Sequence, residues 1–466
     1  MRSGHEAANQ RLARLKGGEI LELWNLYGFS ANPYRFTPLE ASAFDDELYE
    51  SRGDAESQFA SSVTDAAGGV VVISGDLGTG KTSFANVLQH RILNGTAGLG
   101  LRPLPCYFPS QFVKTDNAAT IARKAVDNTI RSVKKYCEMN RSNKLPSETK
   151  RYNDWLFGGA TQQFAIAGTG RTVSPVSAST VEVCADILST IAEECYREVG
   201  VDGLFICLDN AETIGTQNLT DLLKELRDSL LSLPRIWWII IGPSDLYSQI
   251  QRHNKSVSQR IVGQGIELDC LTGQGFHDLI QRRVRAYGKR PDAKAPLSPN
   301  VHQRLHDAAG GELRFALKMG NDILVELNAQ MYQFVKDQYV AQGKKPQSAA
   351  ILSGVKSLLR ERMGGAEYFP DSYVDSTIAH ICKKVLRHLN LQQTLTSALQ
   401  QLDAQSFSVN DLSRLGVPDE FANAEYLETL RAAEVVRQVG AGQSELWALR
   451  HHAYLLSGMG KLAATA

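Results

Sequence analysis

Eight consecutive residues, Gly75 to Thr82, match every position of the phosphate-binding pattern G-x-x-x-x-G-K-[ST]. Glycines let backbone N–H groups close around phosphate oxygens, and the N-terminus of a following helix attracts the same anion. We therefore expect ATP to bind here, with Lys81 on the β- and γ-phosphates and Thr82 on Mg²⁺. A Gly-rich turn without a ligand is the alternative interpretation. The expected nucleotide-binding residues are Gly75, Asp76, Leu77, Gly78, Thr79, Gly80, Lys81, Thr82 and Ser83.

A second candidate metal ligand is Asp209, which ends the apolar run that starts at Gly203. A carboxylate at the carboxyl end of a buried strand is typical of a Walker B motif, in which it binds Mg²⁺ through water. A helix N-cap explains Asp209 taken alone equally well, and the phosphate loop upstream favours the metal role. Thr82 and Asp209 are thus the predicted metal-binding residues.

Short apolar runs predict the strands that must position these residues. The run Val70–Ser74 directly precedes the phosphate loop, and a helix is expected from Ser83 to Leu93. A long helix should end near Val199, and residues 163–173 predict a hairpin with a Gly-rich turn inside an insertion. Further strands are expected at residues 104–108, 203–209, 235–241 and 265–269.

Downstream of residue 272 the pattern is mainly helical. Near the C-terminus, a short helix opening at Ser408 and another at 422–433 precede a hairpin that pairs 435–439 with 445–449. Two helices followed by a hairpin are similar to a winged helix. The helices expected before them are residues 281–287, 301–309, a helix that opens at 310–317, and a segment over 373–402.

Together these features resemble the AAA+ ATPases and, within them, the origin-recognition-complex-like initiators and their prokaryotic relatives, over residues 30 to 330. The resemblance implies an α/β fold, in which a parallel P-loop sheet and a helical lid precede an α+β winged-helix domain. The expected domains are an N-terminal helical preface (1–60), an AAA+ nucleotide-binding domain (61–272) with an insertion near 140–180, a helical lid (273–345) and a winged-helix-like domain (346–466).

The resemblance also implies roles for individual residues. Ser244 would be sensor 1, which faces the γ-phosphate, Arg260 would be the arginine finger, and Arg314 would be the sensor 2 arginine of the lid. An arginine finger acts in trans, so a homo-oligomer that completes the ATP site is implied. A turn residue at Ser244 and a solvated helix end at Arg260 are the alternatives. The candidate catalytic residues are Lys81, Asp209, Glu212, Ser244, Arg260 and Arg314.

One residue departs from the family pattern. Most active AAA+ enzymes place a glutamate directly after the Walker B aspartate to orient the attacking water, whereas this chain has Asn210. Asparagine cannot act as a base. Glu212 can substitute if the chain turns sharply after Asp209 and brings its carboxylate within hydrogen-bond reach of the water. We therefore expect an ATPase with slow hydrolysis.

Composition narrows the class of protein. The 466 residues carry 50 basic and 50 acidic side chains, so net charge predicts no partner. Seven scattered cysteines without a C-x-x-C pair argue against a disulfide framework and favour the cytoplasm. No apolar run approaches the roughly 18 residues that a membrane span needs, so no membrane partner is expected.

The charge distribution leaves contact with DNA open. Lys and Arg bind DNA phosphates, although basic runs are usually just solvated faces. One basic run spans 123–151, and the lid carries a second one at Arg282, Arg283, Arg285, Lys289 and Arg290. The presumed recognition helix is mainly acidic, with Glu425, Glu428 and Glu434 against Arg431.

Two functions therefore remain open. The first is a DNA-associated AAA+ regulator, similar to replication initiators and transposition regulators, that assembles with ATP on duplex DNA. The second is a protein-binding ATP switch, similar to signalling or phage-defence ATPases, whose nucleotide state gates an effector on a separate chain. In both, the winged-helix-like domain is expected to bind a protein partner.

Overall fold

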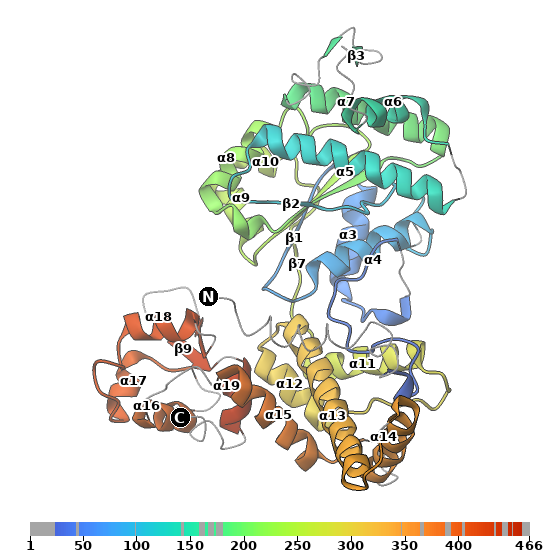
Figure 1. Cartoon of the computed structure of the whole chain (residues 1–466). Helices are drawn as coiled ribbons and strands as arrows, with labels where there is room; N and C mark the ends of the chain where they lie inside the picture. The colour runs from blue at the N-terminus through green and yellow to red at the C-terminus, as the bar shows by residue number, and fades with distance from the viewer. Residues whose placement is uncertain are drawn as a thin grey trace. The chain divides into compact units, whose positions relative to one another are not determined.

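The chain forms two compact units in the computed structural model, Thr37–Cys270 and Met1–Phe36 together with Leu271–Ala466 (Figure 1). We call them the sheet unit and the helical unit. The structure describes residues 24–42, 46–97, 99–140, 144–157, 164–165, 172–173, 180–345, 347–363, 368–386, 393–402, 406–432, 435–439, 446–449 and 451–458.

The sheet unit is built on a parallel sheet with the strand order β2-β5-β6-β1-β7. Its three long strands are buried along their whole length, because they are continuous runs of apolar residues that helices cover on both faces. The predicted α/β class with a parallel sheet is thus confirmed. The strands are β1 (Gly69–Ser74), β2 (Ser110–Gln111), β5 (Leu204–Asp209), β6 (Ile236–Ile241) and β7 (Ile266–Glu267).

Alternate residues of each strand enter two different layers. Val70, Ile206 and Trp238 share one core with the helices α5, α7 and α8. On the other face, the ring of Phe205 lies between those of Phe59 and Trp237. The helices and turns of this unit are η1 (Asp46–Leu48), α3 (Asp54–Thr64), α4 (Lys81–Leu93), α5 (Ala118–Met139), α6 (Ser147–Phe157), α7 (Val181–Glu194), η3 (Cys195–Val199), η4 (Ala211–Thr213), α8 (Thr216–Leu226), α9 (Leu246–His253) and α10 (Lys255–Ser258).

The strand expected at 104–108 is wrong in its position. Leu104 forms a single bridge with Leu204, and the paired strand β2 lies further along the chain, at Ser110–Gln111. Pro105 has no N–H, and the next two amides donate to side chains, Cys106 to Gln89 Oε1 (2.8 Å) and Tyr107 to Ser132 Oγ (3.1 Å). These bonds replace a continuous ladder.

The insertion after α5 carries the predicted hairpin. Its strands β3 (Phe164–Ala165) and β4 (Thr172–Val173) pair antiparallel, which confirms the hairpin, and its glycines at 168 and 170 lie outside the described residues. The start of α6 is held by Glu194, a buried carboxylate of α7 that accepts from the amides of Glu148 (2.5 Å) and Thr149 (2.8 Å). The long helix predicted to end near Val199 is α7 followed by the π-helical turn η3.

The helical unit holds one continuous apolar core. The predicted C-terminal order of two short helices and a hairpin is present, and Phe407 adds one antiparallel bridge to Trp447. Residues 387–392 of the helical segment expected over 373–402, and Glu434, lie outside the described residues. The elements are α11 (Gly273–Tyr287), α12 (Pro299–Ala309), α13 (Leu313–Ala341), α14 (Ser348–Met363), α15 (Asp371–Leu386), α16 (Gln393–Leu402), α17 (Val409–Arg414), α18 (Ala424–Ala432), β8 (Val436–Val439), β9 (Leu446–Leu449) and α19 (His451–Gly458). No helix of the described residues is long and apolar enough to cross a membrane.

A buried polar network fastens residues 32–35 to this unit, and we call it the clasp. Tyr34 Oη and His302 Nε2 are 2.8 Å apart, and His302 Nδ1 is 2.8 Å from His277 Nδ1. Asn32 donates to Asn321 Oδ1 (3.0 Å), and Arg283 donates to the carbonyl of residue 35 (2.8 Å). The clasp therefore joins the N-terminal segment to α11, α12 and α13.

Candidate nucleotide-binding site

The phosphate loop lies between the carboxyl end of β1 and the first turn of α4. Gly75, Gly78 and Gly80 all have positive φ, at 154°, 79° and 96°, which favours glycine. A Cβ atom on Gly75 would lie 2.7 Å from the carbonyl oxygen of Leu268. The loop can keep this path only because these positions lack side chains.

Lys81 extends back over the loop. Its Nζ donates to the carbonyl oxygens of Gly75 and Asp76, each at 2.8 Å. Burial lowers the pKa of Lys81, while the carboxylates of Glu212, Asp209 and Asp76 act to raise it. A cation that is held by neutral carbonyls can exchange these contacts for phosphate oxygens, which bind it more strongly.

Thr82 and Asp209 lie next to each other. Thr82 Oγ1 donates to Asp209 Oδ2 at 2.8 Å, and the amide of Asn210 donates to Asp209 Oδ1, also at 2.8 Å. Asp209 is only 6% exposed. One hydroxyl and one carboxylate are the protein ligands that Mg²⁺ takes at a nucleotide, with phosphate oxygens and waters completing its shell. These two residues therefore fit Mg²⁺. In the described part of the chain, no group of three or more His, Cys, Asp or Glu side chains forms a separate metal site.

The chain turns sharply after Asp209. Asn210 is in the left-handed conformation (φ 64°), which asparagine adopts more readily than most residues, and the turn η4 follows. Glu212 is exposed on this turn, and its charge acts on Lys81. The sharp turn that the prediction requires is present, and the role of Glu212 as the base stays a prediction. This left-handed conformation gives a structural reason for asparagine at position 210, which the sequence pattern does not reveal.

Ser244 lies in the turn after β6, the strand between β1 and β5. The phosphate loop follows β1 and Asp209 ends β5, so the turn of Ser244 is at the same edge of the sheet. Its side chain is exposed. This position agrees with a sensor and equally with a turn residue.

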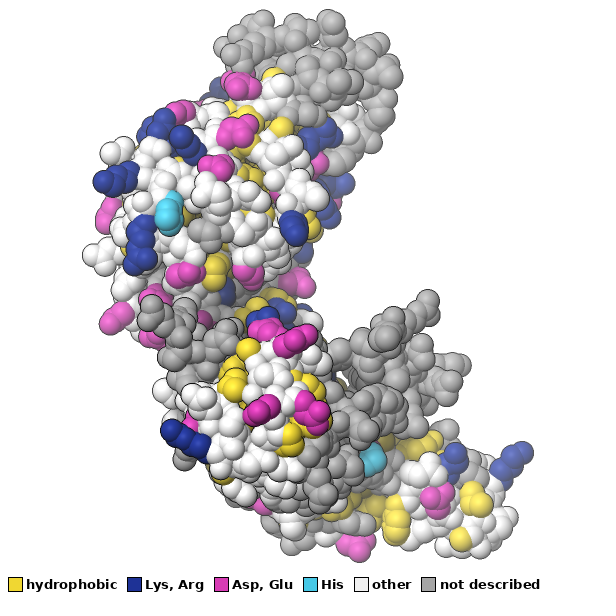
Figure 2. All heavy atoms as spheres, turned by 90° about the vertical axis from the view of Figure 1, so that its left-hand side faces the viewer, with side chains coloured by type: hydrophobic (Ala, Val, Ile, Leu, Met, Phe, Trp, Pro, Cys, Tyr) yellow, Lys and Arg dark blue, Asp and Glu magenta, His cyan; other side chains and the backbone are white. Residues whose placement is uncertain are grey.

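Arg260 lies near the amino ends of the strands, opposite the end that carries the phosphate loop. Its carbonyl accepts from the amide of Val70 (2.9 Å), at the amino end of β1. Gly75 follows Val70 by five positions, so the two ends are roughly 16 Å apart along the strand. The side chain is 45% exposed and 4.0 Å from Asp228, on the α8–α10 side of the unit, where basic and acidic side chains are intermixed (Figure 2). Arg260 does not complete the site of its own chain.

Arg314 is exposed in the first turn of α13, in the helical unit. Gly310 and Gly311 precede it with positive φ values of 54° and 96°. Gly310 and Gly311 thus form a tight turn directly before α13. Arg314 and the phosphate loop belong to different units.

Two residues contact the site without a signal in the sequence. Arg52 donates to the carbonyls of Thr79 (2.9 Å) and Asp269 (2.9 Å), and thereby fixes the phosphate loop to the segment after β7. Burial lowers its pKa. Gln111 lies on β2 in register with Asp209, and its Nε2 is 3.5 Å from Asp209 Oδ2. Because the sequence predicted this strand at 104–108, Gln111 was not among the expected site residues.

The other expected loop residues differ in exposure. Leu77 is 62% exposed, whereas Thr79 is buried and its hydroxyl donates to the carbonyl of Asp76 (3.0 Å). Ser83 Oγ accepts from the amide of Leu39 (3.1 Å). Ser83 therefore fastens the segment before α3 to α4.

Neither basic run forms a uniformly exposed, charged surface. Arg283 is only 6% exposed, so the expectation that it belongs to a solvated basic run is wrong; it is part of the clasp. On α5, Lys124 is paired with Asp116 (2.7 Å), whereas Arg131 is exposed and lies over the ring of Phe108 (4.4 Å). On α18, Arg431 is paired with Glu428 (2.7 Å).

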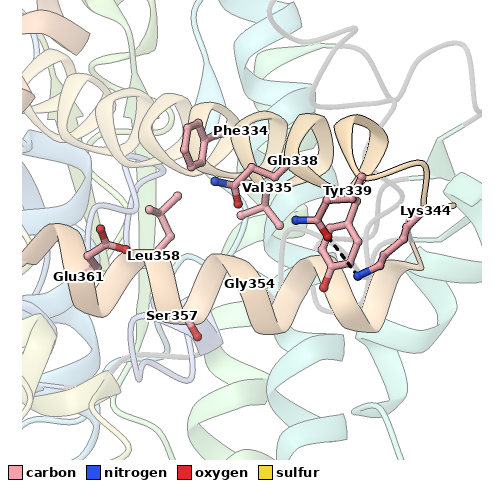
Figure 3. A pocket seen from close by; sticks show the side chains of 10 residues that line it. Phe334, Val335, Gln338, Tyr339, Lys344, Gly354, Ser357, Leu358 and Glu361 are labelled. Atoms are coloured by element: carbon pink, nitrogen blue, oxygen red, sulfur yellow. Dashed lines mark hydrogen bonds between the residues drawn. The ribbon is translucent and has the colours of Figure 1, made fainter.

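A hollow of about 310 Å³ lies between α13 and α14, within the helical unit (Figure 3). Gly354 of α14 closely approaches Val335 of α13, because an added Cβ would lie 2.6 Å from Val335 Cγ1. Lys344 and Glu361 are its charged lining residues. Its lining contains no nucleophilic or metal-binding cluster.

No protein-family model and no curated protein sequence matches this chain. Several solved structures are similar to it. The ORC2 protein of Aeropyrum pernix, in ADPNP and ADP complexes, is 16% identical, with 89% of this chain and 93% of that chain covered and a TM-score of 0.41. The A. pernix ORC1 protein in complex with DNA is 15% identical, with 93% and 96% covered and a TM-score of 0.42. A RuvB branch-migration motor of Thermotoga maritima is 10% identical, with 90% and 97% covered and a TM-score of 0.32.

Proposed function

We propose that this chain is an AAA+ regulator that binds ATP with Mg²⁺ at the phosphate loop, hydrolyses it slowly, and acts on DNA as an oligomer. The observation that carries the proposal is the 2.8 Å contact between Thr82 of the loop and Asp209 at the end of β5, with Lys81 folded over the same loop. Two residues from the first turn of α4 and one from the end of β5 thus lie together at the carboxyl ends of the strands, with the chemistry that a nucleoside triphosphate requires.

Each of these residues would exchange a present contact for one with the nucleotide. Lys81 would leave the carbonyls of Gly75 and Asp76 for phosphate oxygens. Thr82 and Asp209 would hold Mg²⁺, which neutralises charge on the phosphates when it is bound. Arg52 keeps the carbonyl of Thr79 fixed, so that the loop stays open for the phosphates.

Slow hydrolysis follows from the turn after Asp209. Asn210 offers no base, and Glu212 is the carboxylate of this turn that is able to accept a proton. We expect Glu212→Gln to lower the turnover number at least about tenfold while ATP affinity is retained. A high turnover number that Glu212→Gln leaves unchanged would contradict both the slow reaction and the assigned base.

Assembly is proposed because Arg260 is remote from the site of its own chain. Arg260→Ala should bind ATP normally and lose turnover, as an arginine finger supplied in trans predicts. Mixing Arg260→Ala with Lys81→Ala should restore part of the activity, since some mixed sites then hold an intact loop and an intact finger. Arg252→Ala, an exposed arginine at the end of α9, is the matched control.

Contact with duplex DNA is assigned to the α5 face. Arg131 and Lys134 are exposed there, whereas Arg431 of α18 is already paired with Glu428. Charge reversal of Arg131 and Lys134 should weaken DNA binding and reduce its salt dependence, without loss of ATP binding. Turnover that duplex DNA stimulates in the wild type, and not in Lys81→Ala, is the corresponding functional test.

The acidic face of α18 favours the second function, a protein-binding ATP switch. Glu425 and Glu428 lie on this helix, a poor surface for a DNA backbone and a suitable one for a basic protein partner of the winged-helix-like domain. Binding that salt does not weaken steeply, together with turnover that DNA does not change, would favour this function over the first.

A further inference from the structure

Two amide side chains, those of Asn210 and Gln111, lie beside Asp209. Asn210 Nδ2 donates to Gln111 Oε1, and Gln111 Nε2 contacts Asp209 Oδ2 at 3.5 Å. Because Thr82 Oγ1 also donates to Asp209 Oδ2, the four side chains form one hydrogen-bonded chain from the phosphate loop to the edge strand β2. Neither amide is used by the function proposed above.

The position of Gln111 is fixed by its backbone. Ser110 and Gln111 pair with Leu208 and Asp209 in the parallel ladder, and the Gln111 carbonyl accepts from Lys124 Nζ at 3.0 Å. The side chain itself is exposed, and its hydrogen-bond partners are Asp209, at 3.5 Å, and Asn210. A rigid backbone with an open amide group suits a residue that must hold a water molecule.

The turn that carries Asn210 is locked to the same segment. Thr213 Oγ1 donates to the carbonyl of Phe112 (2.8 Å), and the amide of Phe112 donates to the carbonyl of Asp209 (2.9 Å). The backbone of Gln111 therefore has a fixed position relative to Asp209 and to the turn that bears Glu212.

We propose that Gln111 is a positioning residue for ATP hydrolysis, which holds the attacking water through its amide while Asn210 fixes the amide's orientation. An amide group has both a donor and an acceptor, and a glutamine that orients the attacking water is sufficient in some phosphate-loop enzymes. The water oxygen forms the new bond to the γ-phosphorus, the bond to the β-phosphate oxygen breaks, and the proton leaves through Glu212 or the product phosphate. Gln111 itself gains and loses no proton.

The inference rests on the proposed ATPase function and predicts a separation of two quantities. Gln111→Ala should lower kcat by roughly 10–100-fold, with ATP affinity within about twofold of the wild type, because the phosphate and metal contacts of Lys81, Thr82 and Asp209 remain. Gln217→Ala, which removes an exposed amide that donates to Asp221 on α8, is the matched control and should change neither quantity.

Two further measurements distinguish water positioning from mere support of the turn. Gln111→Glu keeps the acceptor for Asn210 and can hold a water, so it should recover part of kcat, with a rate that rises with pH as the new carboxylate ionises. Hydrogen exchange of residues 210–213 in the free protein should be nearly unchanged in Gln111→Ala, because Thr213 and Phe112 still hold the turn.

Each outcome is decisive. A fall in kcat at constant ATP affinity, with recovery in Gln111→Glu, supports the inference. Unchanged kcat in Gln111→Ala overturns it, and so does a wild type that binds ATP without any turnover. Faster exchange at 210–213 together with lost ATP affinity would assign Gln111 a structural role instead. Absence of ATP binding by the wild type would refute the proposed function, and is recognised separately because affinity is measured independently of turnover.

Discussion

The candidate nucleotide site and the clasp are both polar networks, and they differ in burial. In the clasp, His302 is fully buried and Arg283 is 6% exposed. Burial lowers the pKa of His302 to about 3 and that of Arg283 to about 10. At the nucleotide site, Gln111 and Glu212 are exposed. The largest pKa shifts are thus found in the clasp, which has a structural role, whereas the candidate nucleotide site combines the buried Asp209 with exposed groups whose contacts can be exchanged.

The largest effect is expected from reversing a charge in the clasp. Arg283→Glu places a carboxylate against the carbonyl oxygens of Pro33 and residue 35, so the free energy of unfolding should fall by about 3 kcal/mol or more. Denaturant unfolding measures this change. Arg285→Glu, an exposed neighbour on α11, should change stability by less than about 0.5 kcal/mol. Equal effects of the two substitutions would show that the buried contacts of Arg283 do not stabilise the fold.

A smaller effect is expected from acid, through His302. Its folded-state pKa of about 3 lies below the ordinary value of 6.5, because of burial and then of the neighbouring His277. The unfolded chain therefore takes up the proton first, and stability that is present above pH 6.5 is lost as the pH falls. The loss between pH 6.5 and 5 should be on the order of 2 kcal/mol.

His302→Gln is the control for this pH dependence. Glutamine keeps a donor and an acceptor toward Tyr34 and His277 and does not titrate, so the slope of unfolding free energy against pH should become shallower. A wild type whose stability is the same at pH 7.5 and pH 5 would contradict the buried neutral histidine.

The smallest effect is expected at the turn of the open site. Asn210→Ala must adopt a φ of 64°, which costs about 1 kcal/mol, whereas Asn210→Gly adopts it without strain. Thermal unfolding should therefore rank glycine at or above wild type and alanine below it. The reverse order would show that the side-chain amide of Asn210, through its bond to Gln111, outweighs its backbone conformation.

Local sequence patterns predicted the sheet well where the pattern was continuous. The runs at Val70–Ser74 and 235–241 are β1 and β6, because a strand that is buried on both faces has a continuous apolar sequence. The run at 104–108 is equally apolar and forms one bridge, since Pro105 and two side-chain acceptors interrupt its ladder. Tertiary hydrogen bonds of that kind are not visible in a local pattern.

The candidate site was predicted where its residues belong to contiguous motifs, and it was missed where they come from distant segments. The residues of the loop and Asp209 belong to contiguous motifs, and the structure brings Thr82 and Asp209 together. Arg52 and Gln111 reach the site from distant segments, 27 and 98 positions from their partners Thr79 and Asp209. The burial of Arg283 was hidden for the same reason: its partners lie about 250 positions away in the N-terminal segment. The roles of Ser244, Arg260 and Arg314 and the domain boundaries stay predictions.

The central claim, that the loop Gly75–Thr82 is an ATP site, is tested most directly by titrating a fluorescent ATP analogue with Mg²⁺ into the wild type and Lys81→Ala. Within the described part of the chain, the hydrogen bonds of Lys81 Nζ go to loop carbonyls, so its removal should leave the fold intact. We predict saturable binding by the wild type and a loss of at least roughly 100-fold in affinity in the variant. Equal binding by both proteins, or none by the wild type, would contradict the account.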